Sequence, residues 1–391
     1  MDTIIEIYDK EPILNTLASS VFKPDNVVFI GPRSAMNLRT KGQIRRYLSV
    51  RTPNTTPHFF EADIYDVSDV RRVMHEILDR FPEAMIDITG GSSTTLFAVG
   101  LFCKEHKVPV FAYNRKHNVF YNVYHCEQME DIPCDPRFTV EEILAMAGGM
   151  FLKNGHISGD AEDKRLFDEI EAVFKLFMRN TRRWNRFVQY LQATTSIEGK
   201  PLSITAPIRK QKRGSMLVCD EGLMHELEKI GMIEDLRFKG DRVSYRFRSM
   251  TVRQCLNDIG VWLELYVYKT ARDCGGFDDA RISVVVDWNA VEDEAYNTIN
   301  ELDVVLTYGV RPVFISCKSG IPNTTALNEI KMLTNLFGGS HAKGVLATMC
   351  DLKKEAPAAY QRALDMGIGV IDKDDFTSGM LAERLLAVAK Q

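Results

Sequence analysis

The sequence of 391 residues is 45% hydrophobic and 26% charged, which excludes a disordered or fibrous protein and provides enough chain for about two or three packed cores. No apolar run approaches the roughly 20 residues that span a bilayer, so a membrane protein is also excluded. The formal net charge of −4 means that any contact with nucleic acid must come from local basic patches.

The amino-terminal residues, MDTIIEIYDKEP, carry acids instead of the basic and then apolar pattern of a secretion signal, so we expect a cytoplasmic protein. The eight cysteines are scattered, with no CxxC pair and no histidine at zinc-ligand spacing. We expect them to be reduced and mostly buried thiols.

Between residues 26 and 124, short β-rich apolar runs alternate with amphipathic helical ones. Strands are expected at VVFIG, HFFEADI, AMIDITGG and VPVFAY, and helices at residues 41–47, 68–80 and 96–106. This alternation is typical of a parallel sheet wrapped by helices. The segments VFYNVY and EQMED indicate a hairpin or an edge extension of that sheet, and residues 146–158 a loop.

A long amphipathic helix is expected over residues 162–192, because apolar side chains recur there mostly at spacings of three and four. The apolar stripe comprises Leu166, Ile170, Val173, Phe174, Phe177, Trp184, Val188 and Leu191. A stripe of this length often forms a dimer or domain interface.

The sequence changes character over residues 199–249. A polar, loop-like stretch precedes a helix at EGLMHELEKIGMI and a strand at DRVSYRFRS, and this order fits a winged-helix-like connector.

The α/β pattern restarts near residue 250, but with a different order of elements. The expected elements are a helix at 251–271, three strands at 282–287, 303–308 and 312–318, a helix at 324–337, a strand at 344–349, a helix at 357–366 and a strand at 367–372. Three consecutive strands differ from the alternation of the first part. We therefore expect an α/β protein with a sensing domain at residues 1–158, a helical connector at 159–249 and a second α/β domain at 250–391.

Two strand ends in the first domain carry loops of small residues. The loops comprise Gly31, Pro32, Arg33 and Ser34, and Thr89, Gly90, Gly91, Ser92, Ser93 and Thr94. In an open parallel sheet, ligands bind outside the carboxyl ends of the strands, and a glycine-rich turn that opens a helix directs free backbone N–H groups at an anion. The hydroxyls and Arg33 indicate a ligand with phosphates or ribose hydroxyls, although a tight turn with Ser92 as a helix cap explains the second loop about as well.

Polar side chains also gather on the strands of the second α/β domain. Asp303 lies on one expected strand and Lys318 on the next, with Ser316 on the face of Lys318, because side chains alternate along a strand. Glu301 shares the face of Asp303 if its strand begins early, and Glu264 lies on the preceding helix. Carboxylates that converge from a helix and a strand can hold a divalent cation, and a nearby lysine can stabilise charge growing on a phosphate. This is the chemistry of phosphodiester hydrolysis.

Each of these residues has a plainer explanation when taken alone. A lysine after an apolar run is usually a solvated strand end. Cys317 points away from Lys318, which favours a buried thiol over a nucleophile, and leaves its backbone carbonyl as a metal ligand.

The order of GVWLELYVY, NELDVVL and FISCKSG, followed by a helix and a GG turn, resembles the PD-(D/E)xK nuclease domain at the carboxy terminus of CRISPR ancillary effectors. The loops IGPRSAM and DITGGSS are similar to those of the matching CARF domain, a Rossmann-like sensor of cyclic oligoadenylates. The resemblance spans nearly the whole chain, although each motif is short. It implies a nuclease of antiviral defence whose sensor loops hold a ring-shaped activator, such as cyclic tetra-adenylate, across a homodimer.

The resemblance also implies roles for single residues. Glu264 is similar to the family's helix glutamate, Asp303 to its metal-binding aspartate and Lys318 to its catalytic lysine. The implied cofactor is Mn²⁺ or Mg²⁺, with Glu264, Glu301, Asp303 and the carbonyl of Cys317 as ligands. Ser316 departs from the pattern, in which glutamate is usual, and the compensating carboxylates are Glu264, Glu301 or Glu329 on the following helix. Because Asp303 and Lys318 are both present, we favour an active enzyme.

Two other functions stay open. A ligand-sensing regulator would use the connector as a winged helix and place the basic run RKQKR at residues 209–213 on phosphate backbones, but it gives no role to Asp303 and Lys318. An inactive scaffold would bind nucleic acid without cleaving it. For a nuclease, the expected substrate is single-stranded DNA, double-stranded DNA or RNA, because hydrolysis with a metal and a lysine neither requires nor forbids a 2′-hydroxyl.

Overall fold

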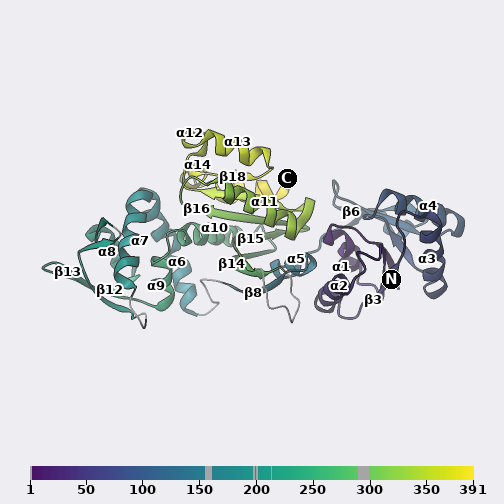
Figure 1. Cartoon of the computed structure of the whole chain (residues 1–391), viewed down its shortest axis with the longest axis horizontal. Coiled ribbons are helices and arrows are strands. Elements are labelled where there is room, and N and C mark those ends of the chain that lie inside the picture. The colour runs from purple at the N-terminus through teal and green to yellow at the C-terminus, as the bar shows by residue number, and fades with distance from the viewer. Residues whose placement is uncertain (1, 155–160, 197–198, 200, 213, 289–298) are drawn as a thin grey trace.

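The computed structural model describes residues 2–154, 161–196, 199, 201–212, 214–288 and 299–391. Three parts follow one another along the long axis of the molecule (Figure 1): an amino-terminal sheet with its helices, a central six-stranded sheet, and a mainly helical connector at the far end. None of the described helices has the length and apolar character needed to cross a membrane. The eight cysteines are free and most of them are buried, as expected.

The amino-terminal domain is a seven-stranded sheet in the order β3-β2-β1-β4-β5-β6-β7. Its strands are β1 (Thr3–Ile7), β2 (Asn26–Gly31), β3 (Thr56–Glu61), β4 (Met85–Asp87), β5 (Val110–Asn114), β6 (Val119–Tyr124) and β7 (Ile132–Pro133). The first five in this order are parallel, so the predicted parallel sheet is confirmed, and β6 and β7 extend it as antiparallel strands. EQMED is not a strand, because Glu127–Met129 form a 3₁₀ turn that buries Met129.

Helices cover both faces of this sheet and join its parallel strands. They are α1 (Leu17–Phe22), α2 (Leu38–Arg51), α3 (Val67–Arg80) and α4 (Ser93–His106). The sequence prediction missed β1, although all five of its residues are buried and it lies in the middle of the sheet. Since β1 separates β2 from β4, it sets the spacing between the two predicted ligand loops.

The central sheet has the order β18-β17-β16-β15-β14-β8. Its strands are β14 (Asp279–Asp287), β15 (Ile299–Tyr308), β16 (Arg311–Lys318), β17 (Lys343–Thr348), β18 (Gly369–Ile371) and β8 (Met150–Asn154). The predicted loop at residues 146–158 is therefore wrong in part, because β8 pairs with β14. This pairing carries the chain into the central sheet before the predicted domain limit at residue 158.

Two helix layers enclose the central sheet. The helices of this part are α5 (Val140–Met146), α10 (Val261–Asp273), α11 (Thr324–Gly338), α12 (Leu352–Glu355), α13 (Pro357–Asp365), α14 (Lys373–Thr377) and α15 (Leu381–Lys390). The predicted helix at 251–271 is two helices, α9 (Met250–Leu256) and α10, because Asp258 turns the chain by accepting the N–H of Gly260 at 2.7 Å.

The connector also differs from its predicted form. The expected helix over residues 162–192 is two helices, α6 (Ala161–Arg179) and α7 (Thr181–Thr195), because Asn180 leaves the helical conformation and caps α7. The apolar stripe is buried within the chain, in the core that also contains α10. It is therefore a domain interface and is not available as a dimer surface.

Residues 203–207 and 209–212, expected as part of a loop, are strands. The connector contains β9 (Ser203–Pro207), β10 (Arg209–Lys212), β11 (Ser215–Val218), α8 (Glu221–Ile230), β12 (Ile233–Lys239) and β13 (Arg242–Phe247). β12, β13 and β9 form one antiparallel sheet, and β10 and β11 form a separate two-stranded ribbon.

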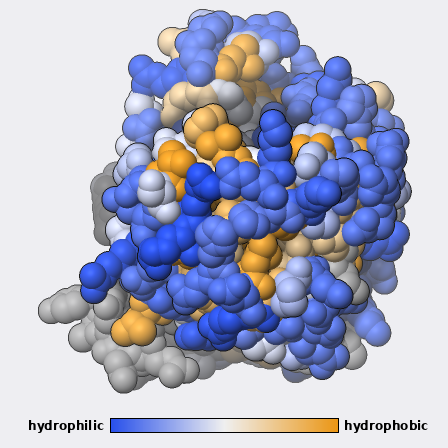
Figure 2. All heavy atoms as spheres, turned by 90° about the vertical axis from the view of Figure 1, so that its right-hand side faces the viewer, coloured by the Kyte–Doolittle hydropathy of each residue, from blue (hydrophilic) through white to orange (hydrophobic). Residues whose placement is uncertain are grey.

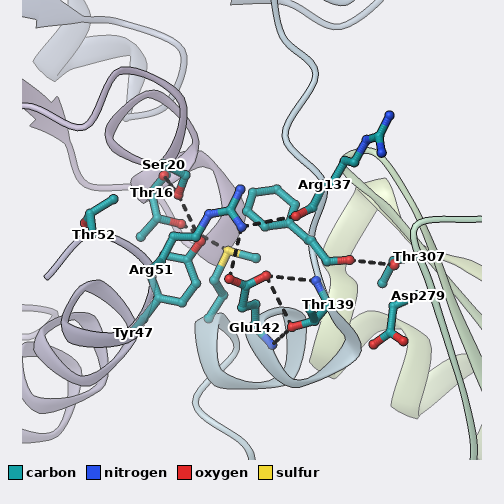
Figure 3. A network of polar contacts seen from close by, with 12 residues as sticks. Thr16, Ser20, Tyr47, Arg51, Thr52, Arg137, Thr139, Glu142, Asp279 and Thr307 are labelled. Carbon is teal, nitrogen blue, oxygen red and sulfur yellow. Dashed lines mark hydrogen bonds and ion pairs between the residues drawn. The ribbon is translucent and has the colours of Figure 1, made fainter.

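The segment between the two large sheets is fixed on both sides by polar contacts (Figure 3). Arg51 of α2 donates to Oε1 of Glu142 on α5 at 3.1 Å. On the other side, the hydroxyl of Thr307 on β15 donates to the carbonyl of Phe138 at 2.6 Å. This segment therefore joins the amino-terminal domain directly to the central sheet.

Candidate active site and ligand loops

Asp303 is tied to the neighbouring strand by its side chain. The ladder between β15 and β16 ends at the pair Val304 and Ile315, and Asp303 is the next residue on β15. Its Oδ2 accepts the backbone N–H of Cys317 at 2.7 Å. In a regular pair of strands such an N–H bonds to a backbone carbonyl of the neighbouring strand, and here the carboxylate of Asp303 takes the place of that carbonyl. This bond holds the carboxylate over β16.

Two side chains of β16 converge on the same carboxylate oxygen. The hydroxyl of Ser316 donates to Oδ2 of Asp303 at 3.2 Å, and Nζ of Lys318 lies 3.4 Å from it. Lys318 keeps 40% of its side chain exposed, whereas Asp303 keeps 19%. Asp303 is thus held in place while the lysine head remains accessible to a substrate.

A cavity of about 90 Å³ lies beside these residues. Its polar lining consists of Glu301, Asp303, Ser316, Lys318 and Glu329. A space of this size holds several water molecules, since one water needs about 10 to 15 Å³ on this measure. The structure therefore brings four of the five predicted catalytic residues, and one predicted substitute carboxylate, to one wet cavity.

The fifth predicted residue, Glu264, lies in the first turn of α10 and does not line this cavity. Burial raises its pKa well above the usual range, and the negative charges of Asp303, Asp258 and Glu301 raise it further, whereas Lys318 opposes the rise. Glu264 is therefore close enough to the cavity residues for their charges to shift its pKa. Glu329 approaches from α11, where its Oε1 accepts from the side chain of Asn300 at 3.2 Å.

The residues present fit a divalent cation by their chemistry. The described residues contain no group of three side chains already gathered as metal ligands. However, the charges of Asp303 and Glu301 help to raise the pKa of Glu264, with Lys318 as the opposing cation, and a bound divalent cation would relieve this crowding of negative charge around Glu264. The thiol of Cys317 is buried and its pKa is raised well above the usual range by that burial, so this residue offers the site its backbone and not its sulfur.

The two predicted ligand loops lie on either side of the end of β1. Oδ2 of Asp9 accepts the backbone N–H of Gly91 at 2.8 Å. A Cβ on Gly90 would lie 2.8 Å from Cβ of Asp9, and one on Gly31 would lie 2.7 Å from Cβ of Tyr8. These glycines therefore allow both loops to pack against β1, and the sequence analysis, which began its strands at residue 26, missed Tyr8 and Asp9.

The predicted ligand residues differ in whether their side chains are held by hydrogen bonds within the protein or exposed to solvent. The hydroxyl of Thr89 donates to Oδ1 of Asp87 and accepts the backbone N–H of Tyr113 at 2.8 Å, so it holds the loop together. Ser92 caps α4 by accepting the N–H of Thr95 at 3.2 Å. In contrast, the side chain of Arg33 is 94% exposed. Ser34 and Ser93 are exposed as well, and Pro32 and Thr94 are partly so.

A pair of buried acids lies under these loops, and the sequence analysis did not single it out. Glu6 of β1 is paired in register with Asp87 of β4. Burial raises the pKa of Asp87 to about 7, against the opposing hydrogen bonds from Thr89, and burial followed by the charge of Asp87 raises the pKa of Glu6. At least one of the two acids is therefore protonated near neutral pH.

Comparison with known proteins identifies the carboxy-terminal domain. Residues 251–388 match the family model described as the Card1-like endonuclease domain. No curated protein matches the sequence.

Three solved structures resemble the chain over most of its length. Protein VC1899 from Vibrio cholerae is 18% identical, with a TM-score of 0.77 over 100% of this chain and 98% of that one. Can2 from Sulfobacillus thermosulfidooxidans, solved with cyclic tetra-adenylate, is 21% identical, with a TM-score of 0.69 over 100% and 99%. A type III CRISPR defence DNA nuclease activated by cyclic oligoadenylate is 14% identical, with a TM-score of 0.50 over 88% of this chain and 45% of that one. The chain therefore has the fold of these proteins, and its residues 251–388 match the model of the Card1-like endonuclease domain.

Proposed function

We propose that the protein is a metal-dependent endonuclease of CRISPR defence that cleaves DNA or RNA when a cyclic oligoadenylate binds its amino-terminal domain. The observation that carries the proposal is the convergence of Asp303, Ser316 and Lys318 beside a water-sized cavity inside a Card1-like endonuclease domain.

The proposed chemistry assigns a role to each side chain. Mn²⁺ or Mg²⁺, held by Asp303 with Glu264, Glu301 and the carbonyl of Cys317, would supply a bound water of lowered pKa and neutralise phosphate charge. Lys318, whose ammonium group is accessible, stabilises the negative charge that develops on the phosphate. Ser316 donates to Asp303 and so orients the carboxylate instead of providing a carboxylate of its own.

The proposed activator site is the pair of loops at Gly31–Ser34 and Thr89–Thr94. The exposed Ser34, Ser93 and Arg33 and the start of α4 suit a ligand with several phosphates. Can2, which has this fold, was solved with cyclic tetra-adenylate, and we propose the same ligand for this chain.

A homodimer is part of this proposal. Figure 2 looks onto the end of the molecule formed by the amino-terminal domain, where hydrophobic side chains lie exposed among hydrophilic ones. Leu38, at the start of α2, is 89% exposed and Phe97, on α4, is 61% exposed. Leu38 lies four residues after one ligand loop and Phe97 three residues after the other, so a second copy that faces the first across a ring-shaped ligand would cover them.

A chain of contacts leads from the ligand loops to the endonuclease domain. Asp9, which holds Gly91, also accepts the backbone N–H of Glu11 at 2.9 Å. Glu11 in turn accepts from the hydroxyl of Ser340 at 2.8 Å and lies 3.1 Å from Nδ1 of His341. Both residues follow α11, the helix that carries Glu329 to the cavity. This path supports activation by a ligand bound far from the cavity.

The regulator is the weaker candidate. In a winged helix the helix before the two-stranded wing reads DNA, and here that helix, α8, exposes Glu221, Glu226 and Glu228. Acidic side chains repel phosphate backbones.

One experiment separates the nuclease from the two functions that involve no cleavage. The protein is incubated with Mn²⁺ and a labelled single strand of DNA or RNA, with and without cyclic tetra-adenylate. The proposed nuclease cleaves the labelled strand in a metal-dependent reaction, and it cleaves faster when the activator is present. A regulator or a scaffold binds the strand and leaves it intact, which would overturn the proposal.

A further inference from the structure

Three exposed arginines of the connector lie together on α7, which is not the helix of the winged-helix pattern. Arg182, Arg183 and Arg186 lie in the first two turns of α7 and are exposed. They line a cavity of about 560 Å³, together with Asn180 and the edge of β11. The cavity is large enough for groups much bigger than a water molecule.

The charges around this cavity leave a positive excess. Arg183 holds Asp220 through two bonds, of 2.6 and 2.7 Å, and this neutralises the nearest acid. Neither Arg182 nor Arg186 forms an ion pair with any residue that the structure describes. Glu221, which also lines the cavity, is the one further acid in that lining.

The ribbon of β10 and β11 adds two lysines to the same side. Leu217 of β11 is buried, and Lys210 is its direct partner in the register. Because partners across an antiparallel pair share a face, Lys210 lies on the side of Leu217, and so does Lys212, two residues further along. Leu217 and Val218 both line the cavity beside α7, and of the two only Leu217 is buried, so the side of the ribbon that carries Leu217 is the one that packs toward α7.

The arginines lie near the edge of the central sheet that carries the catalytic lysine. Burial raises the pKa of the Cys350 thiol, and Arg182 is one of the cations that oppose the rise, which places Arg182 within electrostatic reach of Cys350. Cys350 lies two residues after the end of β17, and Thr348 at that end is paired with Lys318. Figure 1 likewise places α7 next to the central sheet, at the end opposite the amino-terminal domain.

We propose that Arg182, Arg186, Lys210 and Lys212, called here the basic face, bind the sugar-phosphate backbone of the nucleic acid and lead it to the catalytic cavity. The proposal rests on the nuclease function proposed above and names the surface that holds its substrate. A phosphate backbone is the partner that this surface fits, since it presents regularly spaced negative charges to guanidinium and ammonium groups. Contacts of this kind carry no sequence preference.

Binding of a labelled 30-nucleotide single strand tests the proposal directly. Fluorescence anisotropy is measured with Ca²⁺ in place of Mn²⁺ for the full-length protein and for the double variant Arg182→Glu/Arg186→Glu. We expect the Kd to rise at least about tenfold, and the slope of log Kd against log salt to fall by about 0.7 for each lost phosphate contact. The variant Lys210→Glu/Lys212→Glu should act in the same direction, so the conclusion does not depend on one variant folding correctly.

A matched control reverses two exposed charges elsewhere on the connector. Arg237→Glu/Lys239→Glu changes β12, the wing that the regulator would use. We expect this variant to bind within about twofold of the parent protein. If it lost binding while the α7 variant kept it, the strand would lie on the wing and the basic face would be refuted.

Two further measurements separate failure of this proposal from failure of the nuclease function. Cleavage of the oligonucleotide is compared with cleavage of bis(p-nitrophenyl) phosphate, a diester too small to reach the basic face. The α7 variant should lose at least about ten times more activity on the oligonucleotide than on the small diester, mainly through KM. If the parent protein bound the strand but cleaved neither substrate, the nuclease function would be refuted. The anisotropy measurements would still decide whether the basic face binds the strand. Equal affinity for polyglutamate of the same charge would refute nucleic acid as the partner.

Discussion

The hydroxyl of Ser316 lies 3.2 Å from Oδ2 of Asp303, at a strand position where the resembled nuclease family usually carries glutamate. Serine here supports an existing carboxylate and does not supply a second one. The backbone N–H of Cys317 donates to the same oxygen at a shorter distance, 2.7 Å, so the orientation of Asp303 does not depend on the serine alone.

Ser316→Ala should therefore reduce the cleavage rate only mildly. A hydrogen bond to a charged group is worth about 1.5 to 3 kcal/mol, and this one, at 3.2 Å to an oxygen that also accepts from Cys317, should lie at the low end, which corresponds to roughly a tenfold change in rate. Asp303→Ala and Lys318→Ala should each lower kcat by about 100-fold or more, while circular dichroism and activator binding stay at the parent level. Full activity of either variant would remove these residues from the site, and a dead Ser316→Ala would make the serine an essential ligand.

The three candidate carboxylates should separate in a Mn²⁺ titration. Glu301 lines the cavity and Glu264 responds to the charge of Asp303, so Glu301→Ala and Glu264→Ala should weaken the apparent metal affinity as well as the rate. Glu329 is engaged with Asn300, and Glu329→Ala should change the rate with little change in metal affinity. The reverse order, with Glu329 controlling the metal, would place the cation on the α11 side of the cavity.

The buried acid Asp87 should make the amino-terminal domain less stable as the pH rises. Burial raises its folded-state pKa to about 7, from an ordinary value near 4, so the folded state holds a proton that the unfolded state has lost. The free energy of unfolding should fall between about pH 4 and pH 7, by at most about 4 kcal/mol, and change little above that range. Asp87→Asn should flatten this dependence in urea titrations at pH 5 and pH 8. An unchanged slope would mean that Asp87 is not the group responsible.

The sequence predicted which candidate catalytic residues lie together better than it predicted the packing of the candidate ligand loops, for a physical reason. Asp303, Ser316 and Lys318 lie on adjacent strands joined by a short turn, so the alternation of side chains was enough to place them together. Asp9 meets Gly91 across 82 positions of the chain, and no local pattern reveals such a contact.

Long-range pairing also explains the errors in the predicted elements. β8 reads as a loop until its partner β14 is known, and that partner lies about 130 residues further along the chain. The break between α6 and α7 depends on one residue, Asn180, whose side chain accepts the N–H of Arg183 at 2.9 Å while the apolar spacing continues across it. Hydrophobic periodicity detects the buried face of both helices, but it does not detect the cap between them.

Glu11 should carry activation from the sensor to the endonuclease domain. Its Oε2 holds both Ser340 and His341, while Arg115 of the amino-terminal domain donates to the carbonyl of Ser340 at 2.8 Å. Glu11→Ala breaks the contacts to the turn after α11 and leaves the ligand loops and the cavity residues intact. We expect cleavage without activator to stay at the parent level, and the stimulation by cyclic tetra-adenylate to fall at least about fivefold.

The matched control for this variant is Glu83→Ala, an exposed acid of the same domain, which should keep full stimulation. Affinity for the activator, measured by isothermal titration calorimetry, distinguishes lost coupling from lost binding, because coupling between two sites is a free energy separate from the affinity of either site. If Glu11→Ala bound the activator normally and were stimulated as strongly as the parent, the signal would have to reach the cavity by another route. The α5 segment, where Arg51 meets Glu142 and the hydroxyl of Thr307 donates to the carbonyl of Phe138, is another direct connection between the two domains and the next place to break it.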